Sequence, residues 1–114
     1  MSEVSDITEN EMWVVKSTLQ ERYDFDVELQ MADSEIRLRP SDRTLTECPV
    51  FYWEVDDCHF VIFKSGDSRY RCQFYYRLYQ QMGTGVAEYD NLAECITSLL
   101  QVQADHEAKE RGDI

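Results

Sequence analysis

Residues 48–79 read CPVFYWEVDDCHFVIFKSGDSRYRCQFYYRLY, and this stretch decides the fold. It consists of three runs rich in β-branched and aromatic residues, which are typical of strands. Two short polar segments, Asp56-Asp57 and Gly66-Asp67, separate the runs, and each has the length of a two-residue hairpin turn. The stretch therefore predicts three consecutive antiparallel strands.

The two turns predict which side chains share a face of the sheet. A turn at Asp56-Asp57 sets Val55 opposite Cys58, Trp53 opposite Phe60 and Phe51 opposite Ile62. A turn at Gly66-Asp67 sets Phe63 opposite Tyr70 and Val61 opposite Cys72. Alternation along each strand then places on one face Val50, Tyr52, Glu54, His59, Val61, Phe63, Tyr70, Cys72, Phe74 and Tyr76. The other face carries Phe51, Trp53, Val55, Cys58, Phe60, Ile62, Arg71, Gln73 and Tyr75.

Both predicted faces are apolar, whereas an antiparallel sheet with one solvated face alternates apolar and polar side chains. We predict that the second face is a partner-binding surface, because exposed apolar patches of this size mark interaction sites. Its proposed members are Phe51, Trp53, Val55, Phe60, Ile62 and Tyr75. Two alternatives stay open: a helix covers this face and the cluster is core, or the cluster lines a small-ligand pocket.

The flanking segments predict a helix on each side of the strands. Thr8 and Glu11 form a T-x-x-E capping box before a helix over Glu9–Arg22. Alternation over Phe25–Met31 predicts a strand, followed by a turn at residues 32–34, a short strand over Glu35–Arg39 and a loop over residues 40–47. Asn91 caps a last helix, whose polar end over residues 104–114, like residues 1–6, we expect to fray or project.

This order predicts one α+β domain over residues 1–114. It is a two-layer sandwich of a helix, about five antiparallel strands in a meander and a second helix, with both helices on one sheet face. The longest apolar runs are far shorter than the ~20 residues of a membrane span. The acidic N-terminal segment is unlike a secretory signal, so we expect a cytoplasmic protein.

The net charge and the spacing of the cysteines limit the classes of partner and cofactor that we expect. With 23 acidic and 11 basic side chains the net charge is −12, which disfavours nucleic acid and anionic membranes as partners. Cys48, Cys58, Cys72 and Cys95 lack the C-x-x-C spacing of metal or redox motifs, and we predict free thiols and no metal or cofactor.

Candidate chemistry is sparse. His59 faces Glu54 in the predicted register, the arrangement of a base with an orienting carboxylate, but no nucleophile accompanies them. His106 lies in the polar tail and is expected to be solvated. Arginines on strand positions, interleaved with Tyr75 and Tyr79, resemble a single-stranded nucleic-acid platform, but we expect them to pair with carboxylates. These arginines are Arg37, Arg39, Arg69, Arg71 and Arg77.

The sequence thus predicts a small, acidic, non-enzymatic protein-interaction module, with self-association as a homodimer through its aromatic sheet face. In size, charge and element order it resembles type III secretion chaperones and small toxin-immunity proteins, although the chaperones place a helix among their strands. That analogy involves no particular residue. The alternatives are an acidic mimic of nucleic acid that inhibits a nucleic-acid-binding protein, and a small-ligand-binding protein.

Overall fold

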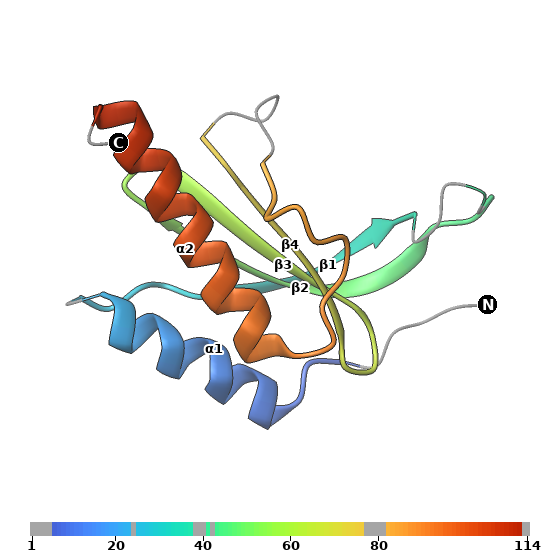
Figure 1. Ribbon diagram of the computed structural model, residues 1–114. Helices are drawn as coiled ribbons and strands as arrows, with labels where there is room; N and C mark the ends of the chain where they lie inside the picture. Colours follow the sequence, from blue (N-terminus) through green and yellow to red (C-terminus); the bar gives the residue numbers. More distant parts are fainter. Residues whose placement is uncertain (1–5, 24, 38–40, 42, 77–81, 113–114) are drawn as a thin grey trace.

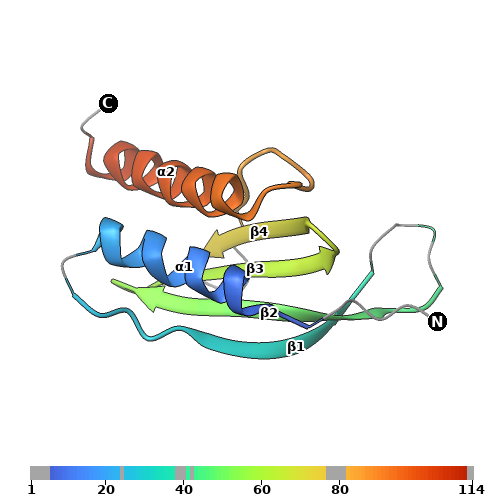
Figure 2. The same cartoon turned by 90° about the horizontal axis from the view of Figure 1, so that it is seen from below.

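The computed structural model describes residues 6–23, 25–37, 41, 43–76 and 82–112. In chain order these form helix α1 (Glu9–Arg22), strands β1 (Gln30–Ile36), β2 (Thr46–Val55), β3 (Cys58–Gly66) and β4 (Arg69–Tyr75), and helix α2 (Leu92–Arg111). The strands make one antiparallel sheet in the order β1-β2-β3-β4. Both helices pack on one side of it (Figure 1, Figure 2). The predicted α+β sandwich is confirmed, with four strands in place of about five.

Helix α1 begins as its sequence predicts. The Thr8 hydroxyl accepts a hydrogen bond from the Glu11 backbone N–H at 3.1 Å, and Glu11 Oε1 accepts one from the Thr8 backbone N–H at 2.8 Å. These two bonds satisfy N–H groups that have no partner inside the helix. Val15 and Leu19 are the buried apolar side chains of α1, and they pack into the core between this helix and the sheet.

The carboxylate of Glu11 also holds α1 to the sheet. Lys64 Nζ on β3 lies 2.9 Å from Glu11 Oε1 and donates to the Asp6 carbonyl at 2.8 Å. The Tyr70 hydroxyl on β4 donates to Glu11 Oε2 at 2.5 Å. Burial alone would raise the pKa of Glu11, but the hydrogen bonds from Tyr70, the Thr8 backbone and Lys64 hold this pKa below its ordinary value of 4.5. Glu11 is therefore a charged anchor inside the domain.

The β2–β3 hairpin has the predicted turn and register. Asp56 and Asp57 both have positive φ, 50° and 66°, which is the geometry of a two-residue turn that follows the strand twist. Val55 faces Cys58, and Phe51 faces Ile62. All three predicted cross-strand pairs are confirmed, including that of Trp53 and Phe60, whose rings stack with centroids 5.2 Å apart.

The predicted β3–β4 register is wrong by one residue. The pairing is irregular between Lys64 and Gly66, and Gly66 itself faces Arg69. The turn is therefore Asp67-Ser68, where Ser68 takes the positive φ of 54°. This shift moves every β4 side chain to the opposite face. The helix side now receives Tyr70, Cys72, Phe74 and Tyr76, and the other side receives Arg71, Gln73 and Tyr75.

Strand β1 also differs from its prediction. Residues 32–34 form no turn, because Ala32, Asp33 and Ser34 pair in sequence with Val50, Pro49 and Cys48 of β2. The two predicted strands are thus replaced by β1, and residues 25–29 approach it without strand pairing. Arg37 follows β1, while residues 38–40 of the prediction lie outside the described residues.

The segment before α2 runs along the free edge of β4. Backbone hydrogen bonds of 2.8 Å join Tyr70 to Tyr89 and Phe74 to Met82 in both directions. Asn91 then caps α2 as predicted, its side-chain oxygen accepting from the Glu94 N–H at 2.9 Å. Neither helix in the described part of the chain is long and apolar enough to cross a membrane.

Helix α2 continues through residues 104–111, the polar segment that we expected to fray or project. Gln103 donates to the Tyr76 hydroxyl at 3.1 Å, and that hydroxyl donates to Glu107 at 3.2 Å. His106 was predicted to be solvated, but its half-buried ring stacks on Tyr76 with centroids 5.6 Å apart. The helix ends at Gly112, whose φ of 80° matches the predicted stop.

One apolar core lies between the helices and the sheet. Its buried members come from both helices, from β2, β3 and β4, and from the segment before α2. They are Val15, Leu19, Phe51, Trp53, Cys58, Phe60, Ile62, Tyr70, Phe74, Tyr89, Leu92, Cys95, Ile96, Leu99 and Leu100.

Candidate functional site

The predicted partner-binding cluster lies mainly in the core. Phe51, Trp53, Phe60 and Ile62 are each 0% exposed and pack beneath the two helices. Val55 is partly buried against the same core, and Tyr75 lies on the opposite face because of the shifted β4 register. The expectation that these side chains form one exposed surface is therefore wrong, and the alternative that helices cover this face holds.

The opposite face of the sheet carries the uncovered aromatic side chains. We call it the open face and define it by the residues of β2, β3 and β4 that point away from the helices. They are Thr46, Cys48, Val50, Tyr52, Glu54, His59, Val61, Phe63, Arg69, Arg71, Gln73 and Tyr75. Most are partly or fully exposed, whereas Thr46, Cys48, Val50 and Val61 are buried. Val61 lies between the larger Tyr52 and Gln73, and Val50 lies beside Phe63.

Three aromatic rings form a row near the β2–β3 turn. The His59 ring stacks on Tyr75 with centroids 4.9 Å apart and on Tyr52 with centroids 5.9 Å apart. The Tyr52 hydroxyl and His59 Nδ1 are 2.5 Å apart. Burial, with Tyr75 and Glu54 nearby, raises the pKa of Tyr52, so Tyr52 is a neutral phenol that can donate to Nδ1. The other ring nitrogen, Nε2, then carries the hydrogen and points toward Glu54, 3.9 Å away.

This row contains the one acid–base pair that the sequence predicted. Glu54 and His59 face each other as expected, and Tyr52 and Tyr75 enclose the imidazole. None of the described serine or cysteine side chains hydrogen-bonds to His59, so the row lacks an activated nucleophile. Within the described ranges no three His, Cys, Asp or Glu side chains gather as metal ligands.

The other end of the open face is apolar and bordered by one ion pair. Phe63 lies between Val50 on β2 and Arg71 on β4. Arg71 Nε lies 3.3 Å from Glu88 Oε2, and the Ser65 hydroxyl donates to the same oxygen at 2.7 Å. For Arg71, this pairing matches the expectation that strand arginines pair with carboxylates. Arg69 is exposed, and Arg39, Arg77 and Tyr79 lie outside the described residues.

Known proteins give no assignment. The chain matches no protein family, no curated protein and no solved structure. The site must therefore be interpreted from its own chemistry.

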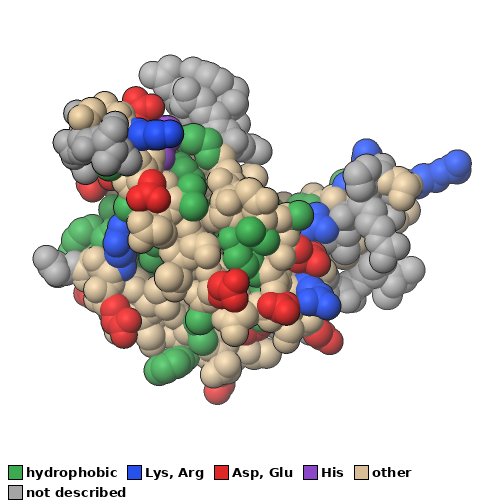
Figure 3. All heavy atoms as spheres, viewed as in Figure 1, with side chains coloured by type: hydrophobic (Ala, Val, Ile, Leu, Met, Phe, Trp, Pro, Cys, Tyr) green, Lys and Arg blue, Asp and Glu red, His purple; other side chains and the backbone are tan. Residues whose placement is uncertain are grey.

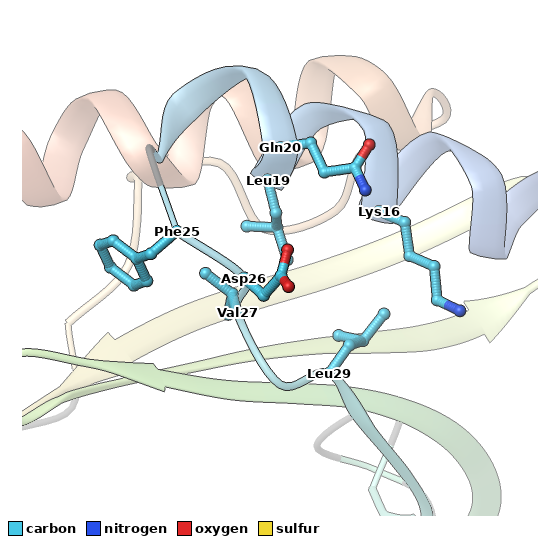
Figure 4. A pocket seen from close by; sticks show the side chains of 7 residues that line it. All are labelled: Lys16, Leu19, Gln20, Phe25, Asp26, Val27 and Leu29. Carbon is cyan, nitrogen blue, oxygen red and sulfur yellow. The ribbon is translucent and has the colours of Figure 1, made fainter.

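A second candidate site is a hollow beside α1, away from the open face. It has a volume of about 310 Å³ and lies between α1 and residues 25–29 (Figure 4). Its walls combine apolar and polar side chains, namely Lys16, Leu19, Gln20, Phe25, Asp26, Val27 and Leu29. Phe25 is 55% exposed at its rim. This volume is at the lower end of the range for small-molecule pockets.

One pattern in the sequence identifies the open face, but only when β4 is placed in its correct register. Arg71 and Gln73 alternate with buried β4 residues, as expected for the solvent side of a strand. With the correct register they lie beside Phe63 and Val61, so the polar side of β4 identifies the uncovered face. The predicted register pairs them with the core side of β3, so it assigns the uncovered face to the wrong side of the sheet.

Proposed function

We propose that this protein is a non-enzymatic interaction module that forms a homodimer through the open face. The observation that carries the proposal is an aromatic and aliphatic sheet surface that neither helix covers. Tyr52, Phe63 and Tyr75 remain partly exposed there, although a solvated sheet face is normally polar. Tyrosine and phenylalanine are enriched in the centres of protein interfaces, where charged residues are depleted.

The charge distribution favours a second copy as the partner. The chain carries a net charge of −12, and on the face drawn in Figure 3 the acidic side chains are spread out rather than gathered in one patch. The open face bears one acid, Glu54, and two bases, Arg69 and Arg71, so it lacks the excess of acidic side chains found in the whole chain. Two such chains repel each other least when they approach through faces without this excess of negative charge.

The face is also self-complementary along its strands. Glu54 and Tyr75 lie at the end near the β2–β3 turn, and Phe63 and Arg71 lie four residues further along their strands. A two-fold axis that lies parallel to the sheet and perpendicular to its strands would set the Arg71 end of one copy over the Tyr75 end of the other. Isologous contacts of this kind are the commonest in homodimers, and arginine over tyrosine is a favourable cation–π pair.

The four free cysteines support a cytoplasmic location within this proposal, because reducing compartments keep thiols unpaired. Of the alternatives, an acidic nucleic-acid mimic has little support from the face drawn in Figure 3, where the carboxylates are scattered. The hollow beside α1 favours small-ligand binding as a second candidate function, with Leu19, Val27 and Leu29 as its apolar wall.

Replacing Phe63 by aspartate is expected to separate the dimer into folded monomers. The new carboxylate would be desolvated in the apolar centre of the interface without a partner, so association should weaken by roughly a hundredfold or more, about 3 kcal/mol. Sedimentation measures the mass against that of the 13.5 kDa chain, and circular dichroism verifies that the variant stays folded.

Phe25→Asp is the matched control, because Phe25 is an exposed phenylalanine beside α1 rather than on the open face. It should leave the dimer intact. A wild-type monomer at micromolar and higher concentrations would refute self-association. If a small apolar ligand then bound the wild type but not Phe25→Asp, the hollow would be the functional site instead.

The protein is expected to show no measurable affinity for single- or double-stranded nucleic acid at physiological salt. Arg71 is paired with Glu88, and the net charge of −12 repels phosphate. Fluorescence anisotropy with labelled oligonucleotides tests this expectation. Salt-sensitive binding that is lost in Arg69→Glu/Arg71→Glu would contradict it and restore the arginine–tyrosine platform.

A further inference from the structure

Two of the four cysteines lie together, on the side of the sheet opposite to the open face. Cys72 is on the helix side of β4, beside Ile62 of β3, and Cys95 is in the first turn of α2 that packs there. The Cys72 Sγ lies 4.0 Å from the Cys95 backbone oxygen, close enough for a thiol hydrogen bond. These residues are 23 positions apart, so their proximity is a product of the fold.

The two thiols have different environments. Cys72 is partly exposed, whereas Cys95 is 0% exposed. A hydrogen bond from the Cys95 thiol lowers the pKa of Cys72 and outweighs the opposing effect of burial. The same contact, together with burial, raises the pKa of Cys95. Cys72 is thus the thiol of the pair that a peroxide in solution can reach, and its lowered pKa favours the thiolate, which is the reactive form.

The other two cysteines, Cys48 and Cys58, lack the partial exposure and the lowered pKa of Cys72. Cys48 and Cys58 are both 0% exposed. Burial raises the pKa of Cys58 to about 12 and also raises that of Cys48. Buried thiols in apolar surroundings are inert, so these two side chains serve as internal references for reactivity.

We propose that Cys72 and Cys95 form an oxidation site, in which a peroxide oxidises Cys72 and Cys95 then closes a disulfide between β4 and α2. In the first step the Cys72 thiolate attacks one peroxide oxygen, the O–O bond breaks and hydroxide leaves, which gives a sulfenic acid. In the second step the Cys95 sulfur attacks the Cys72 sulfur, the S–O bond breaks and water leaves with the thiol proton. Two thiols are oxidised and one peroxide molecule is reduced.

The proposal is independent of the open face, since both sulfurs lie on the helix side. The test treats the folded, reduced protein with hydrogen peroxide, alkylates the remaining thiols and maps peptides without reduction. We expect two of the four thiols to disappear and a single bridge joining Cys72 and Cys95. The oxidised protein should also unfold at a higher temperature, because the bridge restricts the unfolded chain.

Three variants separate the two roles. Cys95→Ser should stop the reaction at the sulfenic acid, which dimedone traps at Cys72, and Cys72→Ser should give neither adduct nor bridge. Cys58→Ser is the matched control and should behave as wild type. Four intact thiols in peroxide-treated wild type, a bridge between any other pair, or dimedone on Cys48 in place of Cys72 would overturn the proposal.

Discussion

Replacing Trp53 by aspartate is expected to abolish the folded state. Trp53 is 0% exposed and stacks on Phe60 beneath the helices, so the substitution removes a large apolar side chain and buries an unpaired carboxylate. Truncating a buried tryptophan alone costs about 3–5 kcal/mol, and a buried charge adds several more. Small domains have about 5–15 kcal/mol of stability in total. Circular dichroism and urea unfolding should find a largely unfolded variant.

The chain supplies a matched control, because its second tryptophan is on the surface. Trp13 is 67% exposed on the outer side of α1, and Trp13→Asp should change the free energy of unfolding by only about 0.5 kcal/mol or less. A folded Trp53→Asp protein with wild-type stability would refute the burial of this face. If that variant stayed folded but lost its association, the originally predicted interface would be correct.

Replacing Glu11 by leucine is expected to have the next largest effect on stability. The change leaves the Lys64 ammonium buried, with the Asp6 carbonyl still accepting from it, and removes the carboxylate that accepts from the Tyr70 hydroxyl. The side chains of Lys64 and Glu11 are only 4% and 10% exposed. Breaking a buried pair on one side costs about 3–5 kcal/mol, which denaturant unfolding would measure.

Glu9→Leu is the control, because Glu9 is another acid in the first turn of α1 but is exposed. Its effect should stay below about 1 kcal/mol. The double variant Glu11→Leu/Lys64→Met should recover part of the loss, since it removes the unpaired charge. Equal stability losses in Glu11→Leu and Glu9→Leu would show that the buried pair contributes nothing.

The same pair gives a pH dependence of defined sign. The folded-state pKa of Glu11 is lowered, so its stabilising effect is present above the ordinary pKa of 4.5 and is lost as the pH falls through the folded-state value. The wild type should therefore lose stability below pH 4.5 more steeply than Glu11→Leu does. Parallel acid unfolding curves for the two proteins would contradict this assignment.

Local signals explain how much of the fold was predictable. The Thr8–Glu11 capping box and the Asp56-Asp57 turn each involve residues close in sequence, and both predictions are confirmed. The Gly66-Asp67 prediction failed because an irregularity in β3 moved the positive φ to Ser68. A shift of one residue in a strand exchanges the two faces of that strand. This local error therefore places Tyr75 on the wrong face and prevents the open face from being recognised.

Contacts between residues far apart along the chain could not be predicted from the sequence. Lys64 follows an apolar run, and nothing near it in the sequence indicates that it is buried. Its partner Glu11 lies 53 positions away. Residues 32–34 contain turn-forming Asp33 and Ser34, yet pairing with β2 outweighs that local preference. In both places a tertiary contact, invisible to spacing along the chain, decides the structure.

The Glu11–Lys64 contact also bears on the order in which the domain assembles. Strands β2, β3 and β4 are joined by two short turns, so their pairing closes only small loops. Docking of α1 through Glu11 must instead bring together positions 53 residues apart, at a larger loss of chain entropy. We therefore expect the meander to form first, with Lys64 still in water, and α1 to dock in a later folding step.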